Sequence, residues 1–197
     1  MPTSVLVRLL FWIWFAAAVL AGQFRLLQRV PPPAVQGILF GLTALLLLGY
    51  FRVTALREWF DRVDLRSIVL VHASRFVGIY FLVLYHRGDL PYAFAVPGGI
   101  GDIIVAFAAV VIVFLPLDYE RRQRFISIWN VVGFIDIALV VLTAIRLNLA
   151  DPSQLRALTV LPLGLLPTFL VPLIIATHVV IFVRIARSRA VTTLSER

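Results

Sequence analysis

Six long apolar segments constrain the fold of this chain more than any other feature of its sequence. The 197 residues are 61% hydrophobic and 14% charged, whereas a soluble domain is about half apolar and about a quarter charged. A stretch of about 20 apolar residues can cross the hydrocarbon core of a bilayer as a helix. We therefore predict an all-α membrane protein, one integral membrane domain over residues 1–197, built as a bundle of six transmembrane helices.

Proline, glycine or clustered charges separate the predicted helices. Their approximate bounds are 5–22, 34–51, 66–86, 98–117, 125–147 and 161–184. The first segment also resembles a cleavable leader over residues 1–21, because an arginine and an apolar run precede small residues. Its length and the tryptophans Trp12 and Trp14 favour a retained helix with an interfacial anchor.

The segment between the second and third helices, residues 52–65, has a different pattern. Its apolar residues recur at helical spacing, and arginines and acidic residues occupy the other side. A helix of this kind lies in the headgroup region. We predict an amphipathic interfacial helix with a structural role.

The distribution of arginine predicts the topology. With six spans both termini lie on one side, which then carries twelve arginines, against five in the loops on the other side. Positive residues are retained on the cytoplasmic side. We therefore expect a bacterial inner-membrane protein with cytoplasmic N- and C-termini, whose basic side meets anionic lipids.

Composition excludes several classes of site. The net charge is +8, but the charges are scattered between apolar spans, so we expect no nucleic-acid partner. All eighteen basic residues are arginine, which excludes a lysine Schiff base, and the absence of cysteine excludes disulfides and thiolate metal sites. No catalytic motif such as GxSxG or HExxH occurs, so we assign no catalytic and no metal-binding residues.

Charged residues inside the predicted spans are the candidate site, because an unpaired charge at membrane depth costs several kcal/mol. The candidate substrate-binding or ion-binding residues are Arg75, Asp102, Asp136 and Asn130. At 1.5 Å per residue, Arg75 and Asp136 both lie roughly 14–17 Å deep, and we predict that they pair. Counted from a helix start at Gly98, Asp102 falls within roughly 8 Å of the opposite boundary, beside His86. The pair is either a structural contact or a relay in which Asp136 titrates against Arg75.

Two histidines suggest an alternative cofactor site. His72 and His178 lie at similar predicted depth, roughly 9 Å, on the third and sixth helices, and Asn130 lies close to the same level. Haem iron takes axial histidines from facing helices. A b-type haem held by His72 and His178, in a membrane electron carrier, is therefore the second hypothesis.

Small residues on the second helix suggest a packing surface. Gly37 and Gly41 are four residues apart, a spacing that lets helix backbones approach closely. The neighbour is either another helix of the same bundle or a partner chain. A structural or assembly subunit, which associates with itself or a membrane partner through Gly37 and Gly41, is the third hypothesis.

One stretch carries a resemblance. The pattern Leu90-Pro91, Phe94-Ala95, Pro97-Gly98 and Gly101-Asp102, followed by Trp129-Asn130, Gly133 and Asp136, resembles small bacterial multi-pass inner-membrane proteins that are uncharacterised. The resemblance implies a bacterial inner-membrane origin and adds no functional residue. The leading hypothesis is a transport or ligand-binding membrane protein that uses Arg75, Asp102 and Asp136.

Overall fold

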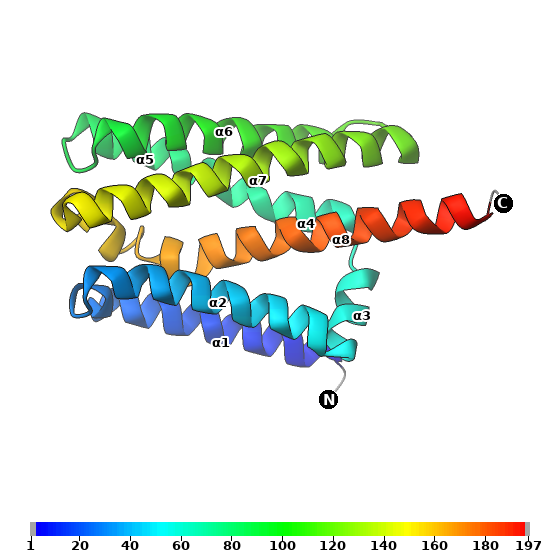
Figure 1. The fold of residues 1–197 in the computed structure, drawn as a ribbon, viewed down its shortest axis with the longest axis horizontal. Helices are drawn as coiled ribbons and strands as arrows, with labels where there is room; N and C mark the ends of the chain where they lie inside the picture. Colours follow the sequence, from blue (N-terminus) through cyan, green and yellow to red (C-terminus); the bar gives the residue numbers. More distant parts are fainter. Residues whose placement is uncertain (1–2, 196–197) are drawn as a thin grey trace.

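The computed structural model describes residues 3–195, with side chains described for residues 3–188. Residues 1–2 and 196–197 of the predicted domain lie outside this range. Every regular element in the described range is helical, and six helical segments are long and apolar enough to cross a membrane. The start of α1 and the end of α8 lie at the same end of the bundle, at the right of Figure 1. We call this the terminal end and the other the distal end.

The first two long helices form one edge of the bundle (Figure 1). α1 spans Thr3–Gln23, and α2 spans Pro32–Arg52 after the short 3-10 turn η1 (Leu26–Gln28). Prolines in the first turn favour the start of α2. The N–H groups of the first turn have no acceptor within the helix, so a proline there removes no hydrogen bond. α1 packs on the start of the last span, where Trp14 Nε1 donates to the Thr168 carbonyl at 2.9 Å.

The predicted interfacial helix corresponds to α3, Thr54–Arg62, which is amphipathic and ends before the third span. Arg184 Nη1 of α8 donates to the carbonyls of Phe60 and Val63, at 3.1 Å and 2.7 Å, and thereby satisfies the C-terminal end of α3. Arg187 and Asp61 add an ion pair at 3.2 Å. These contacts hold α3 against α8.

The third span is interrupted, whereas the sequence predicted one continuous helix over 66–86. It comprises α4 (Leu65–Val71), the 3-10 segment η2 (His72–Val77) and α5 (Gly78–His86). Asp64 caps α4 by accepting from Arg66 N at 3.0 Å. The tighter winding of η2 covers the stretch that carries His72 and Arg75, so it sets the direction of both side chains.

The next two helices begin earlier in the sequence than predicted. α6 spans Tyr92–Phe114 and contains Pro97, so it begins six residues before the predicted Gly98. α7 spans Tyr119–Ala150, because Asp118 caps it by accepting from Arg121 N at 2.8 Å. The basic loop predicted at 118–124 is therefore mostly the first turns of α7.

The last span begins later than predicted. The 3-10 segment η3 covers Pro152–Thr159, and hydrogen bonds from Ser153 lower the pKa of the Asp151 carboxyl at its start. A π-helical turn, η4 (Leu166–Leu170), then leads into α8 (Val171–Ser195). The predicted helix at 161–184 thus starts at Leu166 and continues past its predicted end.

Two apolar cores follow each other along the axis of the bundle. Near the terminal end, α2, α4, α6, α7 and α8 pack around Val69, Ile126 and Ile181. In the distal half, Phe81, Phe94, Ile137 and Leu163 belong to a second core. The buried charged, amide and imidazole side chains lie between the two cores along the third to sixth spans.

Candidate functional site

Arg75 is the centre of a buried ion cluster that joins three elements. Its Nε donates to Asp102 Oδ1 of α6 at 2.6 Å, and its Nη1 donates to the Gly133 carbonyl of α7 at 3.0 Å. Its Nη2 donates to Asp136 Oδ2 of α7. The predicted contact between Arg75 and Asp136 is present. We call Arg75, Asp102 and Asp136 the ion cluster.

The structure corrects the predicted position of Asp102. The sequence predicts Asp102 near the distal boundary with His86, yet Asp102 bonds directly to Arg75. The reason is the start of α6 at Tyr92, which puts Asp102 about 15 Å into the helix. Pro97 and the following glycines predict a helix start, but they lie inside α6.

Close helix packing brings Asp102 to Arg75. A Cβ atom on Gly99 of α6 would lie 2.8 Å from the Gly78 carbonyl oxygen at the start of α5. A Cβ atom on Gly78 would lie 2.9 Å from Asp102 Cβ. Only glycine at these two positions allows the backbones to approach this closely.

The members of the ion cluster differ in exposure. Arg75 is fully buried and Asp102 is almost fully buried, while 20% of the Asp136 side chain is exposed. Asp136 lies beside Gly101 of α6, where a Cβ atom would overlap Asp136 Oδ1. The cluster is therefore closed on the side of Arg75 and open at Asp136.

A second polar group contains both predicted histidines and Asn130. His178 Nδ1 and Asn130 Oδ1 are 2.8 Å apart, and Asn130 Nδ2 donates to the His178 carbonyl at 3.1 Å. His72 Nε2 lies 3.2 Å from the Thr177 hydroxyl. His72 Nδ1 and His178 Nε2 are buried and have no hydrogen-bond partner among the described residues.

The histidine pair does not fit the haem hypothesis. The rings of His72 and His178 are in direct contact, with centroids 4.3 Å apart, and Trp129 lies edge-on to His72 at 4.8 Å. A porphyrin between two axial histidines needs a gap between the rings, and here the rings fill that space themselves. Within the described range, no group of three histidine, cysteine or acidic side chains is arranged to hold a metal ion.

Gly133 connects the histidine group to the ion cluster. Its carbonyl accepts from Arg75, and a Cβ atom at this position would lie 2.8 Å from His178 Cε1 and 3.0 Å from a Val105 methyl group. The sequence predicts these polar residues at three different depths. They form one contiguous polar group across η2, α6, α7 and α8.

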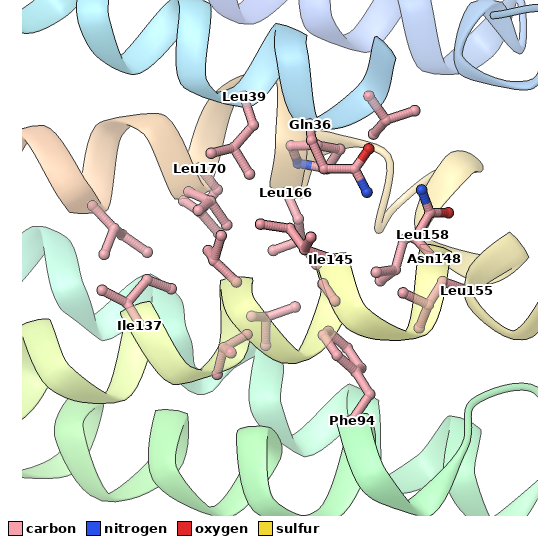
Figure 2. A pocket seen from close by; sticks show the side chains of 18 of the residues that line it. Gln36, Leu39, Phe94, Ile137, Ile145, Asn148, Leu155, Leu158, Leu166 and Leu170 are labelled. Carbon is pink, nitrogen blue, oxygen red and sulfur yellow. The ribbon is translucent and has the colours of Figure 1, made fainter. Parts of the chain in front are cut away.

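An apolar cavity lies on the distal side of the ion cluster, between α2 and α7. Its volume is about 100 Å³, and Arg75 and Asp102 line its inner end. Figure 2 shows Leu39 of α2, Ile137 and Ile145 of α7 and Leu166 and Leu170 of η4 around it.

Polar side chains surround the distal mouth of the cavity. With the Gln36 carboxamide oriented to suit its neighbours, its oxygen accepts from Asn148 Nδ2 at 2.8 Å, and both residues are labelled in Figure 2. A second hollow shares Asn148 and Thr159 with the cavity and is also lined by Ser153 and Arg156. The sequence does not predict this site, because the residues that line it come from many separate segments and share no motif.

The predicted packing surface on α2 faces outward. Gly37 and Gly41 are exposed, and a Cβ atom at either position would meet nothing within 4 Å. These glycines therefore pack against no other helix of the bundle. Association through them stays a prediction.

The comparisons assign a family. The family model of a domain of unknown function, DUF8737, matches residues 32–186, from the first residue of α2 into α8. The match covers most of the chain and all of the polar group described above, so the chain belongs to this family. No curated protein and no solved structure matches the chain.

Proposed function

We propose that this member of the DUF8737 family is a membrane protein that binds or transports a lipid-like amphiphile with one long apolar chain. The observation that carries the proposal is the apolar cavity whose inner end is formed by Arg75 and Asp102. Six helices of suitable length and composition support a membrane location.

The dimensions of the cavity suit an apolar chain. Ile137 at the inner end and Asn148 at the mouth are eleven residues apart on α7, which corresponds to about 16 Å. This depth is about half of a ~30 Å hydrocarbon core, the thickness that one leaflet occupies. The chain would pack against leucine, isoleucine and phenylalanine side chains that line the cavity.

The mouth suits a polar head group. Gln36 and Asn148 offer hydrogen bonds, and the adjoining hollow carries Arg156, which can form a charge-assisted contact with a carboxylate or phosphate. The ion cluster forms the floor of the cavity, with Arg75 already bonded to Asp102, Asp136 and the Gly133 carbonyl. We therefore propose that the head group binds at the mouth and that the end of the chain lies at the floor.

The test uses a photoactivatable fatty acid and the corresponding fatty alcohol, added to the purified protein in lipid nanodiscs. We expect cross-links to cavity-lining residues of α7. Ile145→Trp fills the cavity and should weaken binding about tenfold or more, because overpacking a site costs about 1–3 kcal/mol. Ile135→Trp is the matched control, since Ile135 lies on the exposed face of the same helix.

Two results would contradict the proposal. Equal cross-linking in Ile145→Trp and Ile135→Trp would show that the probe binds the outer surface. Arg156→Gln should reduce cross-linking of the fatty acid more than that of the alcohol, and an equal effect on both would exclude the head-group contact.

A further inference from the structure

The ion cluster carries an unbalanced charge when both of its carboxyl groups are ionised. One guanidinium faces two carboxylates, so the sum is one negative charge in the middle of the bundle. A net charge at membrane depth is costly, and a single bound proton removes it. The question is which carboxyl group holds the proton.

The hydrogen bonds distinguish the two carboxyl groups. Asp102 is nearly inaccessible and bonds to Arg75 Nε at 2.6 Å, in a contact enclosed by η2 and α6. Asp136 bonds to Arg75 only through Oδ2, and its Oδ1 has no hydrogen-bond partner among the described residues. Oδ1 lies over Gly101, where the absence of a side chain leaves room for it.

The exposed part of Asp136 lies on the outer surface of the bundle. Its neighbours Val132, Ile135 and Leu139 on α7 are exposed, as are Ile100 and Ile104 on α6. These apolar side chains mark the outward surface of both helices, and Asp136 lies at its edge beside Gly101. Asp136 does not line the distal cavity.

We infer that Asp136 is the reversible proton-binding site of the ion cluster and holds its proton on Oδ1, which lies over Gly101 between α6 and α7. Arg75 and Asp102 form the permanent ion pair beside it. The charged groups that face Asp136 are Arg75 of η2 and Asp102 of α6. Two histidines lie next to the ion cluster: His178 of α8 is adjacent to Gly133, and His72 contacts His178. The inference does not depend on the ligand proposed for the cavity.

Dicyclohexylcarbodiimide, an apolar reagent for protonated carboxyl groups, provides the test. The acid oxygen adds to the central carbon of the reagent and the proton moves to one nitrogen. The acyl group then shifts from oxygen to nitrogen, so the peptide gains the mass of one reagent molecule and nothing is released. Mass spectrometry of the full-length protein in nanodiscs should place this addition on Asp136 and not on Asp102.

The inference predicts how labelling of Asp136 changes with pH and in one isosteric variant. Labelling of Asp136 should fall about tenfold per pH unit once the ionised form dominates. Asp102→Asn removes one negative charge and keeps an oxygen that can accept from Arg75. The cluster is then neutral with Asp136 ionised, so labelling of Asp136 should fall several-fold.

Gly101→Ala provides a second variant that changes no charge. Its Cβ atom would overlap Asp136 Oδ1, so labelling should fall here too, even if Asp102→Asn fails to fold. Infrared spectra should contain a band of a protonated carboxyl group, and Asp136→Asn should abolish this band. The band detects the proton on Asp136 without the carbodiimide reagent. Labelling of Asp102 instead, absence of that band, or unchanged labelling in Asp102→Asn would overturn the inference.

Discussion

Arg75 connects residues that are far apart in the sequence, since its partners lie 27, 58 and 61 positions away. The guanidinium suits this role because it presents five donors in a fixed planar arrangement. Each bond joins η2 to α6 or α7, so a single side chain links the third, fourth and fifth spans. The sequence indicated Arg75 and Asp136 as partners from their depth alone, while Asp102 required the position of the helix start.

The first prediction concerns Arg75→Met. The variant leaves two carboxyl groups and the Gly133 carbonyl without their donor, and breaking a buried ion pair costs about 3–5 kcal/mol. We expect the free energy of unfolding to fall by about this amount, measured by denaturant titration of the purified protein with circular dichroism. Arg62→Met is the control, because Arg62 is 80% exposed and its contact with Glu58 is a surface pair. An equal, small effect of both variants would contradict the structural importance of the cluster.

At the scale of the element, glycines decide where helices can touch. Gly78 and Gly99 allow α5 and α6 to approach, and Gly133 makes room for His178 of α8 beside α7. Gly37 and Gly41 have the same kind of spacing but face outward. Spacing in the sequence therefore indicates a possible contact surface, and only the packed bundle determines whether another helix of the chain occupies it.

The second prediction compares two glycine substitutions. Gly133→Ala places a methyl group 2.8 Å from His178 Cε1, so we expect a loss of about 1–3 kcal/mol from overpacking. Gly37→Ala meets nothing within 4 Å, and alanine favours a helix by about 1 kcal/mol, so this variant should be as stable as the wild type or more stable. Thermal unfolding of the two purified variants measures the difference. A destabilised Gly37→Ala in a monomeric preparation would contradict the outward orientation of α2.

At the scale of the whole molecule, the bundle is asymmetric along its length. An apolar core fills the terminal end around Val69 and Ile181, whereas the distal half contains the open cavity. The polar group lies between them; Arg75 and Asp102 line the inner end of the cavity, and Asp136 is partly exposed. A ligand in the cavity would therefore exchange with the distal side of the membrane or with its outer leaflet in the predicted topology.

The third prediction concerns orientation in the membrane. The chain has no cysteine, so single cysteines report on one position each. Glu58→Cys in α3 lies at the terminal end and Gln154→Cys in η3 at the distal end, and both positions are exposed. In bacterial spheroplasts an impermeant maleimide should label Gln154→Cys directly and Glu58→Cys only after permeabilisation, because the basic end remains in the cytoplasm. The reverse pattern would contradict the predicted topology.

The sequence alone determined the six apolar segments, the amphipathic α3 and the pairing of Arg75 with Asp136. Segment length, helical periodicity and the cost of isolated charges are local properties, so they can be read without coordinates. The ends of the helices were predicted less accurately, because the boundary between an apolar loop and an apolar helix has no signal in the sequence. The start of α6 was therefore predicted six residues too late, and Asp102 was predicted at the wrong depth. The cavity, the contact between the two histidine rings and the outward direction of Gly37 were decided by tertiary structure. Each depends on which helices lie side by side, and packing between distant segments leaves no periodic pattern in the sequence.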